Sequence, residues 1–181
     1  MPQGLLYQQD FISSEEEAAL LEEIARLSLE EAKYKSFTAK RRTASFGSDY
    51  DFATNQLGPA PDIPAFLQPL RQKAAALTGV TADKFKHALV TEYRPGTELG
   101  WHRDVGQFEL VIGISLAGTC RMRFRHYPPE KGAKIFSLDL EPRSVYVLRD
   151  EIRWRWQHSV APTKELRYSI TFRTRRHPQE K

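Results

Sequence analysis

The chain has 181 residues, enough for one ordinary domain with its own core and too few for two comfortable ones. Its residues are 40% hydrophobic and 28% charged, which excludes the strongly charged, apolar-poor composition of disordered chains. The net charge is only +4, so overall charge alone does not identify a polyanionic partner.

Cys120 is the single cysteine, which excludes an internal disulfide and a thiolate metal cluster. No stretch approaches the roughly 20 apolar residues that span a bilayer, and the first residues lack the basic-then-apolar pattern of an export signal. We therefore expect a soluble, cytoplasmic monomer without membrane contact, in which any metal is bound through nitrogen and oxygen.

Two helices are predicted in the first half of the chain. Ser13 followed by Glu16 is a capping-box pattern, and apolar residues recur behind it at helical spacing, which predicts a helix over about 14–28. A second helix is predicted over 63–77, where Pro64 lies near the first turn and Gly79 closes the end.

Between these helices, residues 34–55 interleave aromatic and basic side chains, and we expect a hairpin or flap there. Basic residues gather in this segment at 40–42, and again at 121–125 and 173–176. These clusters favour a basic face toward a polyanion, although each taken alone is as consistent with solvated surface charge.

The second half changes to short β-rich runs separated by turn residues. Strands are predicted at 88–93, 99–102, 108–116, 120–124, 135–140, 144–148, 154–160 and 167–174. This pattern predicts one mostly β, α+β domain over 1–181, a sandwich or jelly roll with its core at about 86–174. The two N-terminal helices would then support one sheet.

His102 and Asp104 form an H-x-D unit at a predicted strand end, where alternate residues share a face. Two histidines and one carboxylate on one face of an octahedron suit non-haem iron(II) with open positions. His158 is our choice for the third ligand. The other three histidines, at 87, 126 and 177, remain alternatives from spacing alone.

Arg167 and Arg173 favour His158, because they lie on one face of a predicted strand just downstream of it. Two arginines on a face directed into the core are costly unless they meet anions. A five-carbon dicarboxylate supplies two carboxylates, so this strand predicts a cosubstrate clamp. An exposed edge strand with solvated arginines is the alternative.

Taken together, these pieces resemble the AlkB family of iron(II)- and 2-oxoglutarate-dependent dioxygenases over nearly all of the chain. The matching segments are RRTASFG at 41–47, YDF at 50–52, TEYRPG at 91–96, HRD at 102–104, His158 and the arginine strand at 167–173. The resemblance implies a double-stranded β-helix core and catalysis with iron(II), 2-oxoglutarate and O2. Iron would be bound by His102, Asp104 and His158.

The same resemblance implies that Tyr93 and Arg167 hold the distal carboxylate of 2-oxoglutarate. Arg173 would lie near the carboxylate that chelates iron and would steady Asp104. Thr91 and Ser169 stand near the cosubstrate, at positions where the family often has asparagine.

For the substrate, the resemblance implies oxidative dealkylation of N-alkylated bases in single-stranded or locally opened DNA or RNA, that is, alkylation repair. The flap would be a recognition lid, with Phe46 and His102 on the two sides of a flipped base. Tyr50, Arg41 and Arg42 would be further substrate contacts.

One departure from the family pattern bears on the substrate. Repair members usually carry an acidic residue shortly after H-x-D, whereas Val105, Gly106 and Gln107 follow it here and Glu109 is the nearest carboxylate. An oxygenase acting on a protein or small molecule is therefore the alternative. A non-catalytic β-sandwich binding module is a third.

Overall fold

A computed structural model describes residues 1–33, 38–51, 54 and 56–176. Phe52, which belongs to the predicted flap, and His177, one of the alternative ligands, lie outside the described residues. Among the described helices, none is long and apolar enough to cross a membrane.

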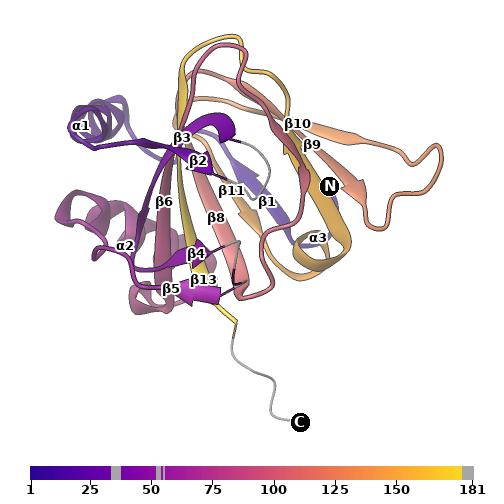
Figure 1. The fold of residues 1–181 in the computed structure, drawn as a ribbon, viewed down its shortest axis with the longest axis horizontal. Helices are drawn as coiled ribbons and strands as arrows, with labels where there is room; N and C mark the ends of the chain where they lie inside the picture. The colour runs from indigo at the N-terminus through magenta and orange to yellow at the C-terminus, as the bar shows by residue number, and fades with distance from the viewer. Residues whose placement is uncertain (34–37, 52–53, 55, 177–181) are drawn as a thin grey trace.

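Two antiparallel sheets dominate the molecule (Figure 1). The large sheet has seven strands, in the order β1 (Leu5–Gln8), β11 (Val145–Leu148), β8 (Phe108–Ala117), β13 (Arg167–Arg175), β6 (Phe85–Tyr93), β3 (Thr38–Phe46) and β2 (Glu30–Lys33). The small sheet has four, in the order β10 (Phe136–Leu140), β9 (Cys120–His126), β12 (Trp156–Val160) and β7 (Leu99–His102). The predicted mostly β jelly roll is confirmed.

The two predicted helices cover the face of the large sheet that points away from the small one (Figure 1). The first is α1 (Ser14–Ala25), and the predicted capping box is present: Glu16 N–H donates to Ser13 Oγ and Ser13 N–H donates to Glu16 Oε2. The second is α2 (Gln68–Thr78), which follows a 3-10 turn at Ala65–Leu67 and ends at Gly79 with a φ of 74°. Their apolar residues form the main core cluster with the inner strands.

A second apolar cluster fills the space between the two sheets, and it includes Met122, Phe124 and Leu148. With helices on one face and the small sheet on the other, β8 is buried along nearly its whole length. This explains why its sequence, FELVIGISLA, reads as a continuous apolar run instead of an alternating one.

Several elements differ from the sequence predictions. Residues 150–155 form a short helix, α3 (Asp150–Arg155), so the strand predicted at 154–160 begins only at Trp156. Asp150 and Glu151 stand in the first turn of this helix, where acidic side chains are favourable. The edge strands β1 and β2 and the small pair β4 (Asp49–Asp51) with β5 (Gln56–Gly58) are too short for alternation to reveal them.

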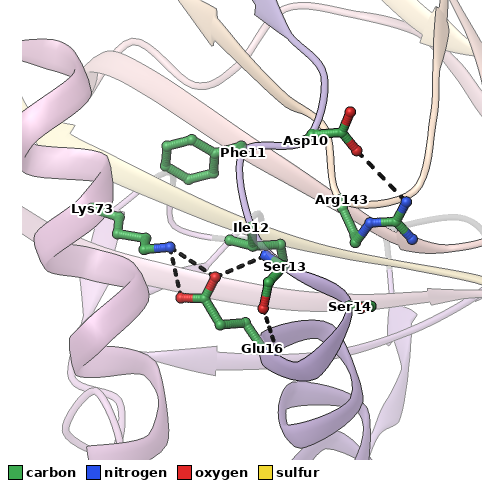
Figure 2. Close-up of a pocket in the computed structure, with 8 residues that line it drawn as sticks. All are labelled: Asp10, Phe11, Ile12, Ser13, Ser14, Glu16, Lys73 and Arg143. Atoms are coloured by element: carbon green, nitrogen blue, oxygen red, sulfur yellow. Dashed lines mark hydrogen bonds and ion pairs between the residues drawn. The ribbon is translucent and has the colours of Figure 1, made fainter.

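A hollow near the start of α1 is lined by side chains that already satisfy one another (Figure 2). Glu16 receives the Lys73 ammonium at 2.6 Å, and Asp10 faces Arg143 at 3.6 Å. Its charged groups thus link α1, α2 and the turn before β11. We interpret the hollow as a packing feature of the helix layer.

Candidate active site

A cavity of about 720 Å³ lies between the two sheets. It is lined from the large sheet by residues of β3 and by alternate residues of β6 and β13, and from the other side by β7 and the segment after it. The cavity contains all three predicted metal ligands and all five predicted cosubstrate residues: His102, Asp104, His158, Thr91, Tyr93, Arg167, Ser169 and Arg173.

The three predicted ligands converge because neighbouring strands carry them. His102 ends β7 and pairs in register with His158 of β12, which brings the two ring centres to 4.3 Å. Asp104 follows two residues after His102, and its Oδ2 lies 3.5 Å from His158 Nε2. One ligand atom from each residue lies within 4.8 Å of the other two, a separation that one metal ion can span.

The protonation states of the histidines suit metal binding. His102 Nδ1 lies 2.8 Å from the Gly100 carbonyl oxygen, which can only accept, so Nδ1 carries the proton and Nε2 keeps its lone pair. Burial lowers the pKa of His102, and lowers that of His158 from 6.5 to about 3, with Asp104 opposing in both cases. Both rings are therefore neutral near pH 7.

Asp104 is held as an anion. Its side chain is only 6% exposed, and burial alone would raise the carboxyl pKa, but Arg173 and the two histidines bring it below its usual value. Arg173 Nε donates to Asp104 Oδ1 at 2.9 Å, and Arg173 Nη1 donates to His87 Nδ1 at 3.2 Å. Two neutral imidazoles and one carboxylate form the donor set that divalent iron accepts.

Arg167 occupies the other end of the cavity and is 2% exposed. Its Nε donates to Ser115 Oγ at 2.9 Å, and its guanidinium lies 4.9 Å from the centre of the Tyr93 ring. It forms no ion pair with any residue that the structure describes. A buried guanidinium without a carboxylate partner is costly, so this end of the cavity is suited to an anionic ligand.

Thr91 and Ser169 complete this end. They are opposite each other in the β6–β13 register, just as Arg167 is opposite Tyr93. On the other side of β13, Ser169 is opposite Ser115 of β8. Arg167, Ser169, Thr171 and Arg173 alternate along one face of β13 and all line the cavity.

The model of the 2OG-Fe(II) oxygenase superfamily matches residues 4–173. The chain belongs to this superfamily. It is 30% identical over 173 residues to tRNA (carboxymethyluridine(34)-5-O)-methyltransferase ALKBH8 of Mus musculus, covering 91% of this chain and 25% of that protein. It is also 32% identical over 137 residues to an uncharacterized protein of Acanthamoeba polyphaga mimivirus, covering 67% of this chain and 63% of the other.

Among solved structures, that of OsALKBH1 superposes with a TM-score of 0.77 at 15% identity, covering 96% of this chain and 98% of that one. This likeness concerns the fold. The superfamily match and the sequence relatives make the chain an AlkB-type dioxygenase that uses iron(II), 2-oxoglutarate and O2. The chain spans less than two thirds of the length of the curated relatives that it matches.

The flap of the AlkB-type dioxygenase differs from the sequence prediction. Successive residues of β3 point to opposite faces, and Arg41, Thr43 and Ser45 line the cavity. Phe46 faces the other way and packs against the main core cluster under the helices. The prediction that Phe46 lies across a base from His102 is therefore wrong in this structure.

Arg42 is likewise directed away from the cavity. Its Nε and Nη2 donate to the two carboxylate oxygens of Glu92 at 2.8 Å each, because Arg42 and Glu92 are opposite each other in the β3–β6 register. Arg94 and the Tyr168 hydroxyl bind the same carboxylate. The predicted substrate contact by Arg42 is wrong here, since this guanidinium is already committed to an anion of the protein.

The remaining flap residues do reach the cavity. Tyr50 and Asp49 line it from β4, and Lys40 and Arg41 line it from β3. Burial lowers the pKa of Arg41, with Tyr93 opposing and Arg173 adding to the effect. Among the described flap residues, Tyr50 is thus the one that supplies an aromatic ring to the cavity.

The sequence did not indicate the positions that four further residues take at the site. Ser115, His87 and Tyr146 come from inner strands, and only the strand pairing brings them to the cavity or to its arginines. Arg153 of α3 is buried and donates from Nη2 to the carbonyls of Val105 and Phe108, which fixes the segment after Asp104. Arg153 directly precedes the strand predicted at 154–160, and nothing in that prediction indicated that its side chain is buried.

Glu109, the nearest carboxylate after H-x-D, does not line the cavity. It accepts from Trp154 Nε1 at 3.2 Å and faces Arg176 at 3.7 Å on the surface. Besides Asp104, the acidic side chains that line the cavity are Asp49 and Glu98. His126 stacks on Trp156 outside the cavity, which leaves His158 as the described histidine that joins His102 and Asp104 in the metal-binding group.

Proposed function

We propose that His102, Asp104 and His158 bind the catalytic iron(II), and that 2-oxoglutarate lies between them and Arg167. Arg167 and Tyr93 would hold the distal carboxylate, beside the hydroxyls of Thr91 and Ser169. Arg173 would orient Asp104, to which it donates a hydrogen bond. Iron(II) with 2-oxoglutarate supplies the activation of O2 at this site, and the cosubstrate is converted to succinate and carbon dioxide.

We further propose that the substrate is an N-alkylated base in DNA or RNA, which the enzyme dealkylates by oxidising the alkyl carbon. The observation that carries this proposal is that the Tyr50 ring and the cationic Lys40 and Arg41 line the same cavity as the metal-binding group. An aromatic ring with basic neighbours suits a single unstacked base and its phosphates. The name of the Mus musculus relative, a tRNA methyltransferase, supports a nucleic-acid substrate.

The test is turnover of a short single-stranded oligonucleotide carrying one 1-methyladenine or 3-methylcytosine, with iron(II), 2-oxoglutarate and O2 supplied. We expect loss of one methyl mass from the oligonucleotide and an equal amount of formaldehyde and succinate. The His102→Ala variant should produce none of these, while its far-ultraviolet circular dichroism matches that of the wild type. Wild-type enzyme that converts 2-oxoglutarate but leaves both methylated bases in DNA and RNA would contradict the proposed substrate.

A second candidate is an AlkB-type oxygenase of a protein or small molecule. It is favoured by the positions of Phe46 and Arg42, two predicted base contacts that lie away from the cavity. The same assay separates the candidates, because oxidation of a free nucleoside or a peptide at a higher kcat/KM than an oligonucleotide would support this one.

A further inference from the structure

The face of the small sheet that points away from the cavity carries two arginines beside a tryptophan. Along β9, Met122 and Phe124 are buried inside the molecule, whereas Arg123 and Arg125 alternate with them and point outward. Trp101 of β7 lies on the same face, 5.3 Å from the Arg123 guanidinium carbon and 4.2 Å from that of Arg125, measured to its ring centre. We call these three residues the arginine–tryptophan face.

Both guanidinium groups are held in place by neutral partners. Arg123 Nε donates to Ser159 Oγ and Arg125 Nε donates to Gln157 Oε1, each at 3.0 Å, from the neighbouring strand β12. Within the described part of the chain, neither arginine forms an ion pair. Arg121, two residues earlier on β9, differs because its Nε and Nη2 donate to the Asp139 carboxylate at 2.8 and 2.9 Å.

This arrangement leaves two positive charges uncompensated and already oriented. A guanidinium fixed through Nε loses little further freedom when its terminal nitrogens bind an anion, and its fork matches a phosphate. Aromatic rings interleaved with arginines are a common platform for unpaired bases. Arginines that serve only as solvated surface charges require neither a neighbouring tryptophan ring nor a fixed guanidinium orientation.

The face adjoins the cavity at the residues that flank His102. Trp101 directly precedes the proposed ligand His102 and itself contributes to the cavity lining. Arg103, on the other side of His102, also lines the cavity and lies 3.9 Å from the ring centre of Tyr127, which is 43% exposed. A strand that leaves the cavity at this edge therefore meets further arginine and aromatic side chains.

We propose that the arginine–tryptophan face binds a single-stranded segment of the nucleic-acid substrate, next to the base that enters the cavity. The phosphates bind Arg123 and Arg125, and a flanking base stacks with Trp101. This inference rests on the proposed function, because it assumes that the substrate is a nucleic acid. It adds a second contact region on a different sheet from the flap.

The test uses fluorescence anisotropy of a labelled, unmodified 12-nucleotide oligouridine at several salt concentrations. The double variant Arg123→Gln with Arg125→Gln should raise Kd about tenfold at low salt. It should also reduce the slope of log Kd against log salt by about 1.4, since each phosphate contact to a single strand contributes about 0.7.

The matched control removes two positive charges that are already paired. Arg121→Gln with Arg26→Gln has the same net charge as the test variant, and its arginines face Asp139 and Glu23. We expect its Kd to stay within about twofold of wild type. A third variant, Trp101→Leu, should raise Kd about tenfold without changing the salt slope, because stacking on an aromatic ring releases no counterions.

Thermal unfolding midpoints within about 2 °C of wild type show that these variants remain folded. Equal weakening by the test and control variants would mean that only net charge matters, and it would overturn the proposal. So would a folded test variant that binds as wild type does. Binding of polyglutamate, but not oligouridine or oligothymidine, through Arg123 and Arg125 would identify an acidic protein partner instead.

The two proposals fail in different ways. If the wild type dealkylates oligonucleotides while Arg123→Gln with Arg125→Gln binds them unchanged, the inference falls and the proposed function stands. If no methylated oligonucleotide is dealkylated but the same variant loses oligouridine binding, the proposed function falls and the nucleic-acid surface stands.

Discussion

At the scale of single residues, the site depends on charged groups, of which some have a charged partner in the protein and others only neutral partners. Asp104 has a protein cation, Arg173, whereas Arg167 has only the neutral Ser115 hydroxyl and the Tyr93 ring. The residue types at these positions were readable in the sequence. Their different partners were not, because Ser115 reaches Arg167 only through the pairing of β8 with β13.

Replacing Arg167 should selectively weaken the binding of 2-oxoglutarate. Arg167→Gln removes the charge that the distal carboxylate would meet, and hydrogen bonds to charged groups contribute about 1.5–3 kcal/mol, or roughly 10- to 150-fold. Steady-state kinetics should therefore show KM for 2-oxoglutarate raised in that range. Ser115→Ala, which only frees Nε of the same guanidinium, should raise KM less; an unchanged KM in Arg167→Gln would exclude its proposed role.

The buried histidines make the metal-free protein sensitive to acid. Burial lowers the pKa of His87 and that of His158 from 6.5 to about 3, with Arg173 adding to the effect on His87 and His102 adding to that on His158. Below pH 6.5 the unfolded chain gains protons that the folded chain does not, so the free energy of unfolding should fall as the pH is lowered from 6.5 toward 3.

Urea unfolding at about pH 7, 5.5 and 4.5 would measure this loss. The His87→Phe variant keeps a ring against Phe108 but cannot titrate, so its unfolding free energy should change less over the same interval. Equal slopes for the two proteins would show that His87 is not the group responsible.

At the scale of elements, β3 shows why the sequence predicted only some of the flap residues that face the cavity. Its sequence, TAKRRTASF, shows no contrast between its two faces, since basic and small residues occur on both. Register with β6 decides which face is which, and it puts Arg41 in the cavity and both Arg42 and Phe46 outside it. By contrast, H-x-D and the arginine strand needed only the alternation within one strand.

The two flap aromatics should therefore respond differently to truncation. Phe46→Ala should lower the free energy of unfolding by about 2 kcal/mol, because a half-buried ring loses part of the 3–5 kcal/mol of a fully buried one. Tyr50→Ala should leave stability nearly unchanged and lower kcat/KM for a methylated oligonucleotide about tenfold. The reverse pattern, measured by urea unfolding and turnover, would contradict this placement of β3.

Gly113 of β8 lies opposite Tyr146 of β11, and the tyrosine ring covers it. A Cβ atom at Gly113 would come within 2.3 Å of the ring, and Tyr146 also lines the cavity. Gly113→Ala should thus cost about 1–3 kcal/mol of stability by overpacking and also raise KM for 2-oxoglutarate. Adding Tyr146→Leu should restore part of the stability, and a double variant no better than Gly113→Ala would argue against this contact.

At the scale of the whole molecule, we propose that residues 1–181 form one domain with one cooperative core. The cavity lies between the sheets, so both sheets must be in place for metal and cosubstrate to bind together. The sequence predicted this two-layer plan from strand count and turns. It did not predict the edge strands, whose few residues carry too little pattern.

Ligand binding should therefore stabilise the entire protein. Manganese(II) with 2-oxoglutarate, each at about 100 times its Kd, should add several kcal/mol, since one ligand at that excess contributes about 2.7 kcal/mol. The thermal midpoint should rise in a single transition that circular dichroism and intrinsic fluorescence report at the same temperature. His102→Ala should show little of this rise, and two separate transitions would disprove the single-domain proposal.

Strand β12 contributes side chains both to the cavity and to the outer face of the small sheet. His158 points into the cavity, whereas Gln157 and Ser159 on either side of it hold the arginines of the outer face. A slip of one residue against β7 and β9 would turn the ligand toward solvent and its neighbours toward the interior. A molecule misfolded in this way would lose both the metal ligand and the proposed nucleic-acid contact. It could therefore neither activate O2 in the absence of a substrate nor bind a substrate that it cannot oxidise.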